Sequence, residues 1–196
     1  ILGFPLTHTN NGWLNLDGTT LSGATTLAEY VRIPDNVTLD GYDAMTWSFW
    51  LKPDRVEAND FIANKRVSTG NQKAWRIIIE TTDGDLKLTV SGDGSTEESQ
   101  VTSDLTLPLN TWTFVTMIFD SGTFTVYKNA NSAIAIDAHF TSQKTVFAST
   151  APLIIGGNDT FNRNWEGAID EFRIYNRALT APENLKNYKH GLSKHS

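Results

Sequence analysis

Two polar stretches of the sequence carry the side chains that sugar binding uses. One holds Asn158, Arg163 and Trp165, and the other holds Asn71 and leads into Trp75. An aromatic ring packs against the C–H face of a sugar, while amide and guanidinium groups hydrogen-bond its hydroxyls. We therefore predict a ligand-binding rim built by these two stretches, with Trp165 as the stacking ring and Asn158 and Arg163 as hydrogen-bonding groups.

The same residues also have a purely structural interpretation. Asn is frequent in loops because its side chain supports turns, and Trp165 could close one end of a folded core. Trp47 and Trp112 lie among apolar neighbours and are expected inside the fold. Trp50 projects opposite Trp47 on an extended segment, so we expect it either to be covered or to line a concave face.

Asp170 is the strongest candidate for a metal ligand. It follows Ile169 and precedes Phe172 in an otherwise apolar run, and a carboxylate in such a place needs a partner. A hydrogen bond to a neighbouring loop would supply one. The alternative is Ca²⁺, which takes six to eight oxygens and mixes carboxylates with backbone carbonyls. Asp17 is a second candidate, although its Asp-Gly pair could serve only a turn.

The acidic residues do not form a catalytic pattern. A retaining glycosidase needs two carboxylates close together, as nucleophile and as acid, and no predicted strand carries Glu-x-Asp-x-Glu. A nucleophile elbow, Gly-x-Ser-x-Gly, does not occur either. We therefore predict that the chain is not an enzyme. The acidic groups weighed are Glu80 with Asp83 and Asp85, Asp93 with Glu97 and Glu98, and Glu166 with Asp170 and Glu171.

Short alternating segments must position these side chains. In residues 75–80, Trp75 and Ile77 share one face and Arg76 the other, and an Asp-Gly pair at Gly84 predicts a hairpin to residues 86–90. A second hairpin is predicted across Ser121-Gly122. Period two with turns at this spacing favours a sandwich or a barrel.

One helix is predicted near the end of the chain. Thr180-Ala181-Pro182-Glu183 reads as a capping box with proline in the first turn. The polar tail from Tyr188 to Ser196 is expected to fray.

Composition narrows the classes of function. The 196 residues include no Cys, carry a net charge of −6 and have a pI of about 5.1. Thiol catalysis is excluded, and without a basic run we predict no nucleic-acid partner. No run of 18 apolar residues exists, so no membrane insertion is expected. The charge favours a neutral or cationic ligand, or a divalent cation.

The length fits a single domain over residues 1–196. Because the chain does not open with Met, we interpret it as a fragment or a mature form of something longer.

Four stretches, taken in order, resemble the laminin G-like and pentraxin-like domains of the concanavalin A-like lectin/glucanase superfamily. The closing stretch is the most specific, since it is similar to a Gly-x-Ile-Asp-Glu-Val-Arg-Ile-Tyr-Asn-Arg-Ala-Leu-Ser pattern. The stretches are Leu16-Asp17-Gly18 with Glu29-Tyr30-Val31-Arg32-Ile33-Pro34, Trp47-Ser48-Phe49-Trp50-Leu51-Lys52-Pro53, Asn110-Thr111-Trp112-Thr113-Phe114-Val115, and Gly167-Ala168-Ile169-Asp170-Glu171-Phe172-Arg173-Ile174-Tyr175-Asn176-Arg177-Ala178-Leu179-Thr180.

The resemblance implies an all-β fold, a two-sheet antiparallel jelly-roll sandwich with one short C-terminal helix. It also implies a bound calcium, because Asp170 stands where related laminarinase-type jelly rolls have a calcium ligand. The expected function is a non-catalytic, lectin-like carbohydrate-binding module of a larger secreted or surface protein, with a glycan or polysaccharide as partner and an extracellular or virion-surface location. The alternative is a structural or adhesive jelly roll that binds protein, such as a surface-layer or virion decoration.

Overall fold

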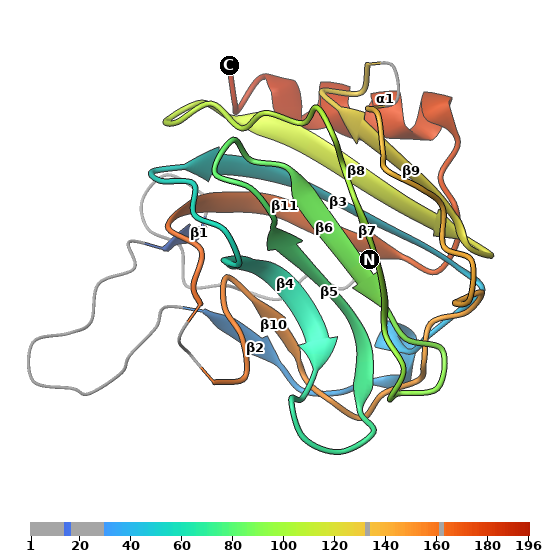
Figure 1. Ribbon diagram of the computed structural model, residues 1–196. Helices are drawn as coiled ribbons and strands as arrows, with labels where there is room; N and C mark the ends of the chain where they lie inside the picture. Colours follow the sequence, from blue (N-terminus) through green and yellow to red (C-terminus); the bar gives the residue numbers. More distant parts are fainter. Residues whose placement is uncertain (1–13, 17–29, 132–133, 161–162) are drawn as a thin grey trace, which may run out of the picture.

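The computed structural model describes residues 14–16, 30–131, 134–160 and 163–196. Two antiparallel sheets face each other, and one helix lies outside them (Figure 1). The expected all-β jelly-roll sandwich with a short C-terminal helix is confirmed. Among the residues described, no helix has the length and apolar character needed to span a bilayer.

The strands divide into a five-stranded and a six-stranded sheet. In the order of the sheet, the first contains β1 (Leu14–Leu16), β11 (Gly167–Tyr175), β3 (Ala44–Pro53), β8 (Thr113–Asp120) and β9 (Thr123–Lys128). The second contains β2 (Val31–Ile33), β10 (Leu153–Ile155), β4 (Phe61–Arg66), β5 (Lys73–Ile79), β6 (Leu86–Val90) and β7 (Glu98–Val101). A 3-10 turn, η1 (Val37–Leu39), leads into β3, and the helix α1 spans Ala181–Leu192.

The core fills the space between the two sheets. Trp47 of β3 and Trp75 of β5 meet there with ring centroids 5.2 Å apart, and Ile77 joins the same buried cluster. Because side chains alternate along a strand, Arg76 and Ile78 of β5 point to the opposite side, away from the core. The alternation predicted for residues 75–79 is therefore confirmed.

The second predicted hairpin joins β8 to β9 through two residues. Asp120 pairs with Thr123, and both residues of the turn have positive φ, 50° at Ser121 and 94° at Gly122. A type I′ turn requires this backbone, and its twist matches the twist of the flanking strands. The turn thus sets the register of this edge of the five-stranded sheet.

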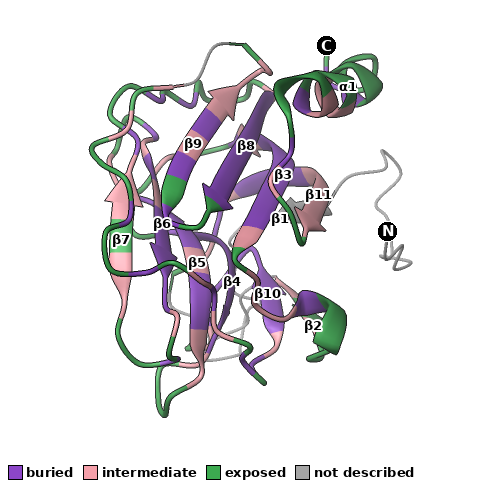
Figure 2. Ribbon diagram, turned by 90° about the vertical axis from the view of Figure 1, so that its right-hand side faces the viewer, coloured by how far each residue is buried: buried purple, intermediate pink, exposed green. Residues whose placement is uncertain are grey.

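Helix α1 covers the outer face of the five-stranded sheet, on the side away from the core (Figure 2). Its first turn contains the predicted capping box, in which the carboxylate of Glu183 accepts the N–H of Thr180 at 2.9 Å. Asn184 accepts a 2.7 Å hydrogen bond from the hydroxyl of Thr116 in β8. These contacts fix the helix on the sheet at its N-terminal half.

The C-terminal tail is folded, contrary to the prediction that it frays. The ring of His195 stacks on Trp50 with centroids 4.3 Å apart, and Tyr188 stacks on Trp50 from α1. A Cβ at Gly191 would lie 2.3 Å from Nε1 of Trp50, so only glycine fits this close approach. Trp50 is buried under these residues. It therefore does not line an open concave face.

Candidate functional site

A row of side chains crosses the outer face of the six-stranded sheet. Residues opposite one another on paired strands point to the same side, and the register joins one residue from each strand. We call this set the outer row. Its members, from β2 to β7, are Arg32, Ile154, Asn64, Arg76, Thr89 and Ser99.

Hydrogen bonds connect three polar members of the outer row and tie a fourth to the neighbouring loop. Nε of Arg76 donates to the hydroxyl of Thr89 at 3.2 Å, and the hydroxyls of Thr89 and Ser99 lie 2.8 Å apart. Asn64 donates from Nδ2 to the carbonyl of Gly157 at 2.7 Å, while its Oδ1 is buried without a hydrogen-bond partner. The row is therefore pre-ordered, with donors and acceptors held on rigid strands.

Two arginines lie close together on this face. Arg66 at the end of β4 forms an ion pair with Glu97, with Nη1 and Oε1 3.3 Å apart. Burial lowers the pKa of Arg76, and the positive charge of Arg66 lowers it further, against the opposing effect of Glu97 and Glu80. Arg76 forms no ion pair with any residue that the structure describes. The centre of the face is thus positively charged in an acidic protein.

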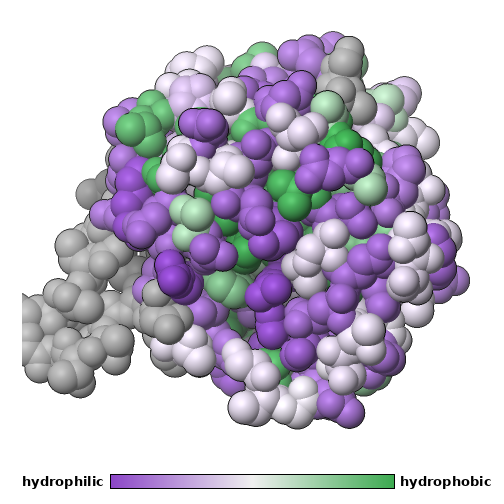
Figure 3. All heavy atoms as spheres, viewed as in Figure 1, coloured by the Kyte–Doolittle hydropathy of each residue, from purple (hydrophilic) through white to green (hydrophobic). Residues whose placement is uncertain are grey.

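The six-stranded sheet lies in front in Figure 1, and Figure 3 shows the same side of the molecule as spheres. Hydrophilic side chains cover most of this side, with small apolar areas between them near the middle. Partly buried polar groups on a sheet face suit a polar ligand better than a flat apolar partner surface.

The two loops predicted to form a rim do lie together. The hydroxyl of Ser68, in the loop between β4 and β5, donates to Oδ1 of Asp159 at 2.8 Å. The carbonyl of Gly157 contacts Asn64 in the outer row. The loop after β10 therefore extends over one end of the outer row and reaches the loop before β5.

The aromatic residues predicted for this rim lie in the core. Trp165 is 1% exposed and Trp75 2% exposed, so neither ring offers a face for a sugar. Asn158 is buried and its Oδ1 accepts the N–H of Thr160 at 3.2 Å, as a turn-forming Asn does. The stacking role of Trp165 is thus corrected to closing the core beside β10, where the backbone N–H of Trp165 donates to the carbonyl of Gly156 at 3.1 Å.

Arg163 and Asn71 keep the accessibility that the rim prediction requires, since both are exposed. The outer row was not found from the sequence. Its members stand far apart along the chain, and only the strand register brings them together. The available signal was the polar face of residues 75–80, which placed Arg76 opposite two core residues.

Asp170 has a protein partner. Its Oδ2 lies 2.9 Å from Nε2 of His195, and its Oδ1 accepts the N–H of Glu171 at 2.7 Å. In the described part of the chain no three His, Asp or Glu side chains are grouped as a metal site. Asp17, the other predicted ligand, lies outside the described residues. Both oxygens of Asp170 therefore already have protein partners. Calcium at Asp170 stays a prediction.

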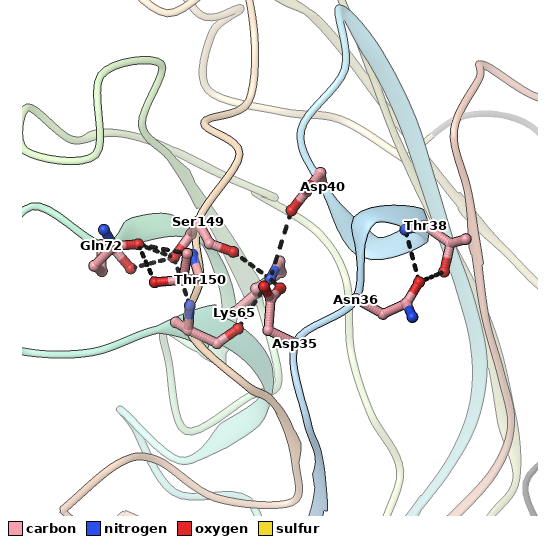
Figure 4. Close-up of polar contacts among 9 residues, drawn as sticks. Asp35, Asn36, Thr38, Asp40, Lys65, Gln72, Ser149 and Thr150 are labelled. Atoms are coloured by element: carbon pink, nitrogen blue, oxygen red, sulfur yellow. Dashed lines mark hydrogen bonds and ion pairs between the residues drawn. The ribbon is translucent and has the colours of Figure 1, made fainter.

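A buried lysine, Lys65, lies on the inner side of β4, and Figure 4 shows its polar contacts. The side chain of Lys65 is 1% exposed, and its ammonium bonds Asp35 and the carbonyls of Ser149 and Ala151, the last at 2.9 Å. Asp40 lies 3.9 Å away. This lysine faces the core side because it pairs with Trp75, and it ties two loops to the sheet.

A cluster of carboxylates surrounds Arg55 beside β4. The guanidinium contacts Glu57, Glu166 and Asp60, the last at 3.1 Å. Burial raises the pKa of Asp60 to about 6, although Arg55 and Arg163 oppose the shift. A carboxyl that titrates near neutral pH could donate a proton, so this cluster is the place to look for acid catalysis.

The two facing antiparallel sheets define a jelly-roll β-sandwich. A family model described as the concanavalin A-like lectin/glucanases superfamily matches residues 24–183. The chain therefore belongs to this superfamily, as the closing motif predicted.

Solved structures share the fold at low sequence identity. A heptameric SAP-like pentraxin from Limulus polyphemus aligns with a TM-score of 0.62 and 19% identity, over 87% of this chain and 78% of that one. Domain 4 of AbnA, a GH43 extracellular arabinanase from Geobacillus stearothermophilus solved with arabinotriose, aligns with a TM-score of 0.61 and 22% identity, over 83% of this chain and 75% of that one. The binding domain of Paraclostridial Mosquitocidal Protein 1 aligns with a TM-score of 0.60 and 20% identity, over 92% of this chain and 48% of that one. No curated protein sequence matches the chain significantly.

Proposed function

We propose that this protein is a non-catalytic carbohydrate-binding module, and that its glycan lies on the outer face of the six-stranded sheet around Arg76. The observation that carries the proposal is the outer row, in which a guanidinium, an amide and two hydroxyls are held side by side across neighbouring strands. The arabinanase domain of the same fold was solved with arabinotriose, which supports a saccharide as the ligand class.

The chemistry of the row suits sugar hydroxyls. A guanidinium offers five donors, and a hydroxyl or an amide can both donate and accept. Arg76 is partly buried and Ser99 is exposed, whereas Asn64 and Thr89 are buried. A ligand would therefore reach Arg76 and Ser99 from the β7 side, and Thr89 would hold both in place through its hydrogen bonds. Because none of the Phe, Tyr and Trp side chains that the structure describes is classed as exposed, we expect weak binding, on the order of millimolar to micromolar Kd.

The carboxylates near the row are arranged for ion pairing rather than for catalysis. Glu97 is shared between Arg66 and Lys73, at 3.3 and 3.2 Å, and Glu80 pairs with Lys87. Each acid is therefore paired with a cation, whereas a glycosidase also needs a carboxyl that is free to donate a proton to the substrate. Asp60 has the raised pKa of an acid, but it is buried and held by Arg55.

A secreted or surface setting belongs to the same proposal. The similar arabinanase is described as extracellular, and the chain spans about half of the mosquitocidal binding domain. A module of a larger secreted or surface protein would present the outer face to polysaccharide.

A structural or adhesive role would require a broad apolar surface. The exposed large apolar side chains among the described residues come from three separate places, namely η1, the loop before β8 and the outer side of α1. They are Val37, Leu109, Leu185 and Leu192. This dispersion favours the glycan over a protein partner.

A glycan array followed by calorimetric titration tests the proposal. We expect Arg76→Gln to weaken the selected glycan at least tenfold, because it removes the central donor. Lys186→Gln removes the same charge from exposed helix α1 and should leave Kd unchanged. If Arg163→Ala weakens binding and Arg76→Gln does not, the loop rim is the site instead. If no glycan binds, the structural alternative takes its place.

A further inference from the structure

The charge of the molecule is distributed unevenly, and the outer face carries the positive excess. The whole chain has a net charge of −6. On this face, Arg66 and Lys73 share one carboxylate, Glu97. Arg76 and Arg32 have no acidic partner among the residues the structure describes.

The two central guanidiniums also have donors to spare. Nε of Arg66 is buried and has no hydrogen-bond partner, and the side chain of Arg66 is only 10% exposed. Arg76 uses Nε for Thr89, and it carries two further nitrogens. Buried donors without acceptors are costly, so a ligand that supplies acceptors there gains more than the same ligand would gain in water.

Repulsion between Arg66 and Arg76 favours a negatively charged ligand over a neutral one. Burial and the charge of Arg66 both disfavour the ionised form of Arg76, and a neutral hydroxyl leaves that repulsion in place. A carboxylate would offset it and would accept two parallel hydrogen bonds from one guanidinium fork. The net charge suggested a neutral or cationic ligand, whereas the charges at the face favour the opposite sign.

We propose that the preferred ligand is an acidic saccharide, with the carboxylate of a hexuronic acid bound between Arg66 and Arg76 and its ring hydroxyls facing the exposed Ser99. This inference rests on the proposed glycan-binding function and names the ligand class for the same face. It assigns recognition of the acid to the arginine pair and recognition of the ring to the exposed hydroxyl of Ser99.

Matched pairs of trisaccharides test it. Trigalacturonate, a trimannuronate and a glucuronate-containing trisaccharide are each titrated beside the product in which every carboxyl group has been reduced to the alcohol. We expect at least one acid to bind tenfold or more tightly than its reduced partner. Raising the salt from about 0.05 to about 0.5 M should shrink that advantage, because screening weakens charge pairing.

Single substitutions show which residues cause the tighter binding of the acid. Arg76→Gln should remove the advantage of the acid, and Arg66→Lys should reduce it, since lysine keeps the charge but loses the planar fork. Lys186→Gln on α1 is the charge-matched control and should leave it intact. If a glycan binds through Arg76 but every acid equals its reduced partner, the acidic preference is wrong and the proposed function stands. If neither these sugars nor any array glycan binds, the proposed function fails as well.

Discussion

Nε2 of His195 lies 2.9 Å from Oδ2 of Asp170, which joins the end of the chain to the middle of β11. The other ring nitrogen, Nδ1, lies 2.7 Å from the carbonyl of Gly191. The ring also stacks on the face of Trp50, with ring centroids 4.3 Å apart. His195 therefore packs on an aromatic surface while both of its ring nitrogens lie within hydrogen-bond distance of an oxygen.

The pair predicts a stability effect that does not depend on calcium. His195→Ala should lower the free energy of unfolding by about 2–4 kcal/mol, because it opens a space over Trp50 and leaves Asp170 unpaired. A double-mutant cycle with Asp170→Asn should give a coupling of about 1–3 kcal/mol. The measurement is urea unfolding in EDTA and again in calcium.

Calcium at Asp170 would have to compete with His195 for the same oxygen. If the sequence-based prediction of calcium is right, the Tm of the wild type falls in EDTA and that of Asp170→Asn does not. The His195 pair predicts instead that Asp170→Asn lowers the Tm equally in both buffers.

Removing the buried charge of Lys65 should lower the free energy of unfolding more than removing a more exposed charge does. Lys65→Met leaves Asp35 and the carbonyls of Ser149 and Ala151 without their donor, and breaking a buried pair in this way costs about 3–5 kcal/mol. Lys87→Met removes the more exposed pair with Glu80 and should cost under about 1 kcal/mol. Equal losses for both variants, measured by urea unfolding, would show that the buried ammonium is not an anchor.

Asp60 should make the protein less stable as the pH rises. Burial raises its pKa from the ordinary 3.8 to about 6 in the fold, so the folded state binds the proton more tightly than the unfolded chain does. The cost of ionising Asp60 is absent below about pH 4, grows between pH 4 and 6, and is fully present above pH 6.

Replacing Asp60 removes that cost. Asp60→Asn should be more stable than the wild type by about 1–3 kcal/mol at pH 8 and should match it at pH 3.5. Asp43→Asn, at an exposed position, is the control and should show no pH-dependent difference. A stabilisation of equal size at both pH values would mean that the effect is not ionisation.

No glycosidase activity is expected. Asp60 has a raised pKa, and Glu166 lies beside it on the same guanidinium of Arg55, so this pair is the strictest test. Release of reducing ends from neutral and acidic polysaccharides should stay at the level of a heat-denatured sample. Hydrolysis that disappears in both Asp60→Asn and Glu166→Gln would overturn the non-catalytic assignment.

Local patterns in the sequence predicted the local structure well. The two-residue turn at Ser121 and Gly122 and the capping box at Thr180 follow from the backbone needs of these residue types. The alternation around Trp75 also indicated that its ring faces the core. That alternation contradicted the ligand role predicted for Trp75. The burial of Trp75 agrees with the alternation and not with the ligand role.

The site depended on long-range pairing that composition does not reveal. Asn64, Arg76 and Thr89 become neighbours only through the register of β4, β5 and β6. The covering of Trp50 required knowing that α1 and His195 fold back on β3. The composition of a polar loop likewise does not show whether an aromatic ring in it points outward or, as at Trp165, into the core.

The location of the ligand is tested most directly by titrating ¹⁵N-labelled protein with the array-selected glycan and following the backbone amide signals. We predict that the shifts concentrate in β4, β5 and β6, around Asn64, Arg76 and Thr89, and that α1 and β8 stay unchanged. Shifts confined to the loops that contain Asn71 and Arg163, or to α1, would contradict the assignment of the outer face as the binding site.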